Sequence, residues 1–128
     1  MRAMILAAGL LTTGTAHAQD IALSSAVYVE RERDGSVHIE PADRFARGDR
    51  VVTIVRWDPR PGANHTITTP VPVGLALQSA SHPALQISVD GGRTWRRLVD
   101  PRDIPRDTTH LRWRAGAEGR LSYRAVVR

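Results

Sequence analysis

The stretch Gly48–Leu77 decides the fold class, and it reads GDRVVTIVRWDPRPGANHTITTPVPVGLAL. Residues 51–57 are rich in β-branched side chains and predict a strand. Because side chains alternate along a strand, one face of this segment should be buried; it carries Val51, Thr53, Val55 and Trp57. Two prolines and a glycine within Asp58–Gly62 end the strand. Residues 66–69 predict a second strand, which Pro70 ends.

The same pattern of short strands continues on both sides of this stretch. Asp34-Gly35, between alternating residues 25–33 and 37–40, predicts a tight hairpin. Further strands are predicted at residues 75–79, 85–89, 110–114 and 120–127. Short strands separated by turns favour an all-β, immunoglobulin-like antiparallel β-sandwich of about seven to eight strands.

The first 18 residues are typical of a secretory signal peptide. Arg2 precedes the apolar segment Met4–Leu11, and Ala16-His17-Ala18 is a small-x-small cleavage site. This apolar segment is too short to span a bilayer as a helix, which needs about 20 residues. We therefore expect a signal peptide at 1–18, a single domain at 19–128 without a membrane span, and a periplasmic or extracellular location at the cell surface.

The composition restricts the chemistry that the chain can perform. It has no cysteine, so disulfides and thiol chemistry are excluded. All 18 basic residues that carry a fixed charge are arginine, and the formal net charge is +5. A basic balance favours anionic partners or solubility and says nothing about the fold.

One segment, Ser88–Trp95, has the sequence SVDGGRTW and matches the Asp-box pattern found in sialidases and other propellers. The aspartate can accept backbone N–H groups of the turn, glycine permits a positive φ, and the tryptophan packs under the hairpin. A single copy in a chain of this length cannot build a propeller. We therefore interpret the pattern as a structural turn rather than a ligand site, and it is formed by Ser88, Asp90, Gly92, Thr94 and Trp95.

The last two predicted strands carry arginines on the face opposite their apolar residues. If these strands are neighbours, they present one basic surface, formed by Arg112, Arg114, Arg120 and Arg124. Arginine forks suit carboxylate and phosphate groups, so anionic polysaccharide is a candidate partner, and nucleic acid is a less favoured one. The alternative, which surface charge alone favours, is a solvated face.

No residues with the spacing of a catalytic or metal site are apparent. The histidines after the predicted signal lack metal-ligand spacing: His38, His65, His82 and His110. Asp100, Asp103 and Asp107 are interleaved with arginines and lack the glycine of a calcium loop. We therefore expect no catalytic residue, metal or cofactor, and the protein is not expected to be an enzyme. The tryptophans are expected in the core or at a hairpin base: Trp57, Trp95 and Trp113.

Several segments together resemble the conserved repeat domain of bacterial surface proteins, often catalogued as the domain of unknown function numbered eleven. The resemblance rests on Gly48-Asp49, Asn64, Ile67-Thr68 and Val71–Gly74, together with Tyr28–Arg31 and Ser122–Val127. The family usually has an Asn-Thr-Gly turn where this chain has Asp58–Gly62. The resemblance implies an immunoglobulin-like sandwich, export, and a structural or adhesive role without catalytic residues.

Two functional classes follow for a non-enzymatic protein of the cell envelope or surface. The first is a structural or assembly module, in which the terminal strand Arg120–Arg128 pairs with another envelope protein or another copy by strand addition. The alternative is a binding module for an anionic glycan or envelope polymer that uses the arginine-rich face.

Overall fold

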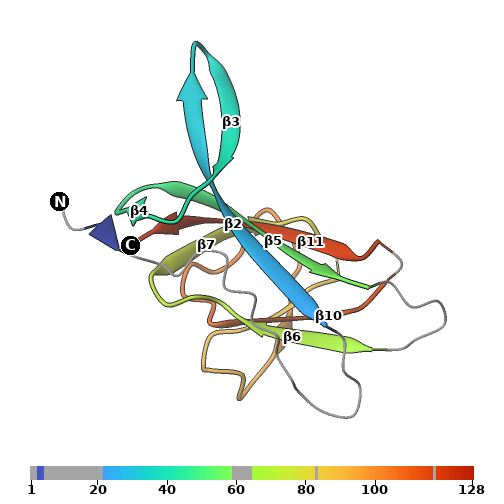
Figure 1. Ribbon diagram of the computed structural model, residues 1–128. Helices are drawn as coiled ribbons and strands as arrows, with labels where there is room; N and C mark the ends of the chain where they lie inside the picture. The colour runs from blue at the N-terminus through green and yellow to red at the C-terminus, as the bar shows by residue number, and fades with distance from the viewer. Residues whose placement is uncertain (1–2, 5–21, 59–64, 83, 117) are drawn as a thin grey trace.

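The protein is an all-β antiparallel sandwich, seen here in a computed structural model that describes residues 3–4, 22–58, 65–82, 84–116 and 118–128 (Figure 1). No helix occurs in these residues, and the strands of each sheet pair antiparallel. The structure thus confirms the predicted all-β sandwich. Within the described ranges, nothing resembles a long apolar helix of the kind that crosses a membrane.

One sheet has five strands in the order β3-β2-β5-β11-β7. Its members are β2 (Leu23–Arg33), β3 (Ser36–Pro41), β5 (Arg50–Trp57), β7 (Leu75–Ala80) and β11 (Arg120–Val127). The other sheet has four strands in the order β6-β10-β8-β9. Its members are β6 (Thr66–Pro70), β8 (Gln86–Ser88), β9 (Arg96–Arg97) and β10 (His110–Arg114).

A short third pairing joins β1 (Ala3–Met4) to β4 (Phe45–Ala46). The side chain of Phe45 is buried in the core. The rest of the predicted signal peptide, residues 1–2 and 5–18, lies outside the described residues. Most of the predicted turn Asp58–Gly62, namely residues 59–62, also lies outside them.

The core fills the space between the two sheets. The four residues predicted to face inward on β5 are all buried: Val51, Thr53, Val55 and Trp57. Trp57 meets Trp113 of the opposite sheet with ring centroids 5.6 Å apart. The indole N–H of Trp57 donates to the Gly116 carbonyl at 3.3 Å. Trp95 is only half-buried and lies at the base of a hairpin, so two indoles rather than three occupy the core.

The expectation that the last two strands are neighbours is wrong. β10 lies in the four-stranded sheet and β11 in the five-stranded sheet. The chain changes sheets between them: Ala115 N–H donates to His65 O beside β6, and Trp57 N–H of β5 donates to Gly119 O. A connection this short usually forms a hairpin, but here its two ends bond to different sheets.

The expectation that the strand Arg120–Arg128 offers a free edge is also wrong. β11 pairs with β5 along one side and with β7 along the other, so both of its edges are occupied. Strand addition to this segment would require one of these native pairings to break. The face of β11 that packs into the core buries Leu121, Tyr123, Ala125 and Val127.

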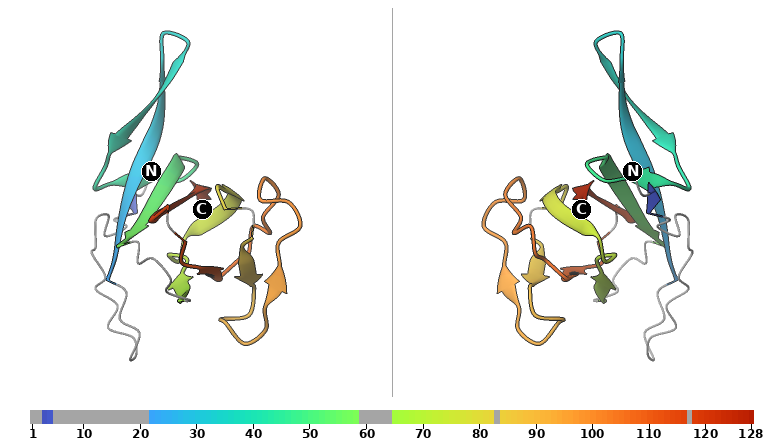
Figure 2. Two further views of the ribbon diagram at one scale, coloured as in Figure 1. Left: turned by 90° about the vertical axis from the view of Figure 1, so that its right-hand side faces the viewer. Right: turned by 90° about the vertical axis from the view of Figure 1, so that its left-hand side faces the viewer.

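The predicted hairpin at Asp34-Gly35 is present and extends beyond the sandwich. Asp34 and Gly35 have φ values of 52° and 78°, as a type I′ turn requires. β2 pairs with β5 only as far as Val29, whereas it pairs with β3 as far as Arg33. The tip of the β2–β3 hairpin therefore projects away from the body, as Figures 1 and 2 show.

Candidate anion-binding site

The four arginines predicted to form one basic surface lie on two different faces of the molecule. Arg112 and Arg114 are on β10, where they alternate with the buried Leu111 and Trp113 and therefore face outward from the four-stranded sheet. The other two arginines face outward from the five-stranded sheet, because their neighbours on β11 are buried. The prediction of a single basic surface is therefore wrong, because the two pairs of arginines lie on the outer faces of different sheets.

The arginines on the five-stranded sheet are not poised for a common ligand. Arg124 forms an ion pair with Glu30 of β2, whose side chain is only 12% exposed. Arg120 lies directly opposite Arg56 in the β11–β5 register. Arg124 is thus neutralised within the fold, whereas Arg120 faces a like charge, which weakens a sheet.

The outer face of the four-stranded sheet brings three arginines together. The strand registers align Arg112 with Thr68 on β6 and with Gln86 on β8, and Gln86 in turn with Arg97 on β9. Directly paired residues point to the same face of a sheet, so these side chains form one row across all four strands. Arg114 lies one step further along β10 on the same face.

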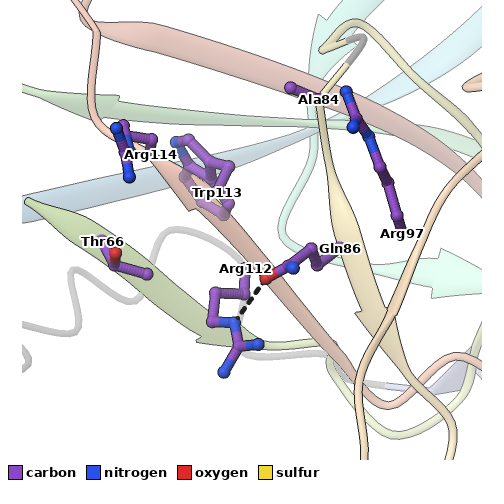
Figure 3. A pocket seen from close by; sticks show the side chains of 7 residues that line it. All are labelled: Thr66, Ala84, Gln86, Arg97, Arg112, Trp113 and Arg114. Atoms are coloured by element: carbon purple, nitrogen blue, oxygen red, sulfur yellow. Dashed lines mark hydrogen bonds between the residues drawn. The ribbon is translucent and has the colours of Figure 1, made fainter.

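These side chains surround a hollow of about 390 Å³, which we call the arginine pocket (Figure 3). Its lining consists of Thr66, Ala84, Gln86, Arg97, Arg112, Trp113 and Arg114. The described residues that line the pocket therefore contribute three guanidinium groups and no carboxylate. Among the described residues, none of the ion pairs includes any of these three arginines.

Arg112 is held in place by two contacts. Its Nε donates to Gln86 Oε1 at 2.8 Å, which Figure 3 shows as a dashed line. Its guanidinium carbon also lies 4.2 Å from the ring centre of Trp95, a cation–π contact. The two terminal nitrogens keep their N–H groups for another acceptor, because the glutamine occupies only Nε.

The Asp-box segment is closed by hydrogen bonds to the Asp90 carboxylate. Asp90 Oδ1 accepts from the Ser88 hydroxyl at 2.7 Å and from the Arg93 and Thr94 N–H groups at 3.1 and 2.9 Å. Its Oδ2 accepts from the Thr94 hydroxyl at 2.5 Å. These bonds, that from the Thr94 hydroxyl most of all, lower the pKa of Asp90 to about 2. Since both carboxylate oxygens are engaged within the turn, a structural role fits this segment.

This turn also positions the tryptophan that contacts Arg112. Trp95 donates its indole N–H to the Gly92 carbonyl at 3.1 Å, and Gly92 N–H donates to the Ser88 hydroxyl at 2.9 Å. The ring of Trp95 also meets His110 edge-on, with centroids 6.4 Å apart. The turn and the arginine face, which are separate features in the sequence, therefore form one structural unit.

Sequence reasoning missed Arg97 and Gln86 as members of this site. Arg97 lies on a two-residue strand directly after the turn, where no alternation of apolar and polar residues is long enough to assign a face. Alternation along residues 85–89 predicts that Gln86 faces outward, but its bond to Arg112 follows only from the register of β8 beside β10. The side-chain amide oxygen of Gln86 accepts the hydrogen bond from the Arg112 guanidinium.

Neither a metal site nor a relative of known function adds to this description. Within the described ranges, no three His, Cys, Asp or Glu side chains are grouped so that they could hold a metal ion. No family model, no curated protein and no solved structure matches the chain. The resemblance to the repeat domain of bacterial surface proteins therefore stays a prediction, and the arguments below rest on the geometry.

Proposed function

We propose that this protein binds an anionic polymer, foremost an acidic glycan of the cell envelope, through the arginine pocket. The observation that carries this proposal is the grouping of Arg97, Arg112 and Arg114 around one open hollow whose described lining includes no carboxylate. Guanidinium groups bind carboxylate, sulfate and phosphate groups through paired N–H donors. Because Arg112 is already oriented by Gln86 and Trp95, it loses less conformational freedom when it binds.

The spacing of the charges favours a polymer over a single small anion. Arg97 and Arg112 are two strands apart, which corresponds to about 9–10 Å across the sheet. Arg112 and Arg114 are two residues apart on one strand, or about 7 Å. These are separations of the backbone positions. Anionic groups that repeat along a chain can engage one arginine each, so a polymer can use all three arginines at once.

The binding role is better supported than assembly through the terminal strand. The segment Arg120–Arg128 lacks the open edge that strand addition requires. The predicted signal peptide supports placing the partner outside the cytoplasm, in the periplasm or at the cell surface. The proposed function involves no reaction, and the arginines act as ligands of the polymer.

Retention on polyanions tests this proposal. The full chain is applied to immobilised heparin, a sulfated glycan, and to immobilised polygalacturonate, a carboxylated one, and is eluted with salt. We expect salt-sensitive retention of the natural protein. The double variant Arg97→Gln and Arg112→Gln should elute at distinctly lower salt.

The matched control removes the same charge from the other sheet. Arg56→Gln with Arg120→Gln lowers the net charge equally, at exposed positions away from the pocket. This control should elute close to the natural protein. Equal loss of retention in the two double variants would show general charge attraction instead of a site and would refute the proposal.

A further inference from the structure

β3 is an edge strand of the five-stranded sheet, and among the described strands it pairs with β2 alone. The opposite edge of this sheet, β7, is covered: Ala80 N–H donates to Pro101 O and Ile104 N–H donates to Gln78 O. No described residue forms a comparable backbone hydrogen bond to the outer side of residues 36–41. The strand also carries two large exposed apolar side chains, Val37 at 66% and Ile39 at 49% exposure.

The turn geometry fixes which backbone groups of β3 face outward. In a two-residue type I′ hairpin the flanking pair, here Arg33 and Ser36, is hydrogen-bonded, and bonded pairs then alternate along the ladder. Ser36, His38 and Glu40 therefore bond to β2. The N–H and C=O groups of Val37 and Ile39 point to the free edge.

We propose that β3 pairs antiparallel with β3 of a second copy of this chain, about a two-fold axis at Ile39. This proposal is independent of the proposed function, because it uses a different sheet and different residues. Ile39 of the two copies would exchange both backbone hydrogen bonds, and each Val37 N–H would donate to the Pro41 carbonyl of the other copy. Such an isologous interface closes on itself and gives a dimer rather than a fibre.

The side chains complement one another in this register. His38 lies opposite Glu40 of the other copy, and this pairing occurs twice because of the symmetry. Charged side chains on an edge strand usually discourage pairing, but here the opposed groups are a basic and an acidic one. Glu40 already contacts Arg33 of its own hairpin at 2.8 Å, and its side chain remains 37% exposed. On the other face Val37, Ile39 and Pro41 of the two copies would form one apolar strip.

A register shifted by one residue in each copy is less favourable. It also satisfies the outward groups of Val37 and Ile39, but it places His38 opposite His38 of the other copy. This register also gives up both His38–Glu40 pairings, because Glu40 then lies opposite Ser36 of the other copy. The two registers therefore differ in which residue lies on the symmetry axis, Ile39 or His38, and this difference can be measured.

Single-cysteine variants of the full chain test both the contact and the register. The natural chain has no cysteine, so each variant has one thiol and a disulfide can form only between copies. The variants are Ile39→Cys, His38→Cys and, as the control for random collision, Val99→Cys at a residue that is 97% exposed. Bonded antiparallel pairs have Cα atoms about 5.5 Å apart, which suits a disulfide.

Under mild oxidation we expect Ile39→Cys to form a covalent dimer roughly tenfold faster or more than Val99→Cys, because pairing raises the effective thiol concentration. Sedimentation of the cysteine-free protein should show a concentration-dependent species of twice the 14.1 kDa monomer mass. Ile39→Lys should abolish that species, and its unchanged β-sheet circular dichroism would show that it folds. Equal oxidation of Ile39→Cys and Val99→Cys would overturn the contact, and faster oxidation of His38→Cys than of Ile39→Cys would overturn the register.

Discussion

Tyr123 is the group whose ionisation should weaken the fold at high pH. It lies on the interior strand β11, between Thr53 of β5 and Ala80 of β7, and it is 3% exposed. Burial raises the pKa of Tyr123 from 10.0 to about 12. A raised folded-state pKa means that its stabilising effect is complete below the unfolded pKa near 10 and is lost as the pH rises towards 12.

The size of this loss follows from the shift. Each pKa unit corresponds to about 1.4 kcal/mol, so a shift of about two units should remove about 2–3 kcal/mol of unfolding free energy by pH 12. With a urea dependence of roughly 1–3 kcal/mol per M, the urea midpoint should fall by roughly 0.7–3 M. The loss should begin near pH 10 and be absent at neutral pH.

Few other side chains of this chain ionise between pH 8 and pH 12. The chain has no lysine and no cysteine, and its tyrosines are Tyr28 and Tyr123 only. Urea titrations between pH 8 and pH 12 should therefore show the fall in the natural protein and in Tyr28→Phe, whereas Tyr123→Phe should lose most of it. The reasoning is refuted if Tyr123→Phe retains the full fall, or if absorbance titration of Tyr28→Phe shows the remaining phenol ionising near 10.

Two other predictions concern the turn and the sheet face. The carboxyl of Asp90 should titrate with a pKa of about 2 by NMR. Because this pKa is depressed, the stabilising effect of the carboxylate is present above its ordinary pKa of 3.8 and is lost as the pH falls towards 2. Asp90→Asn should remove this loss of stability in acid. Arg120→Glu should raise the unfolding free energy by about 0.2–1 kcal/mol, because it replaces a like charge opposite Arg56 by an opposite one. Arg50→Glu changes the net charge equally but lies opposite the uncharged Val126 in the same strand pair, so a similar gain there would show a general charge effect instead.

Local sequence signals predicted most strands, because each depends on neighbouring residues. Asp34-Gly35 supplies both positive φ values of its turn, and the hairpin follows from it. The buried face of β5 follows from simple alternation. Most bonds of the Asp-box turn likewise lie within Ser88–Trp95. Residues outside it contribute the bonds of Thr109 to Gly91 and Ser88 and the contacts of Trp95 with His110 and Arg112.

Local signals could not show that β10 and β11 belong to different sheets. Both strands alternate correctly, and the short segment between them predicts a hairpin. Whether the chain instead changes sheets depends on the bonds of Ala115 to His65 and of Gly119 to Trp57, which join residues about fifty or more positions apart. The arginine pocket depends on the same topology, because β9 and β10 meet only through β8. The binding residues on one strand were therefore predictable, but the set that acts together was not.

The place of β11 has a consequence for the order in which the molecule is built. Among the described elements, β11 is the one strand of the sheet that pairs with β7. β5 pairs with β2 on one edge and needs β11 to pair with its other edge. During synthesis, β5 and β7 therefore precede β11, their common partner. Until β11 pairs with them, the core residues Val51, Val55 and Leu77 are incompletely buried. A nascent chain shorter than residue 120 can form the β2–β3–β5 meander, yet it cannot complete the sheet. Final assembly of the sandwich is therefore a late event that depends on non-local pairing, which is intrinsically slow.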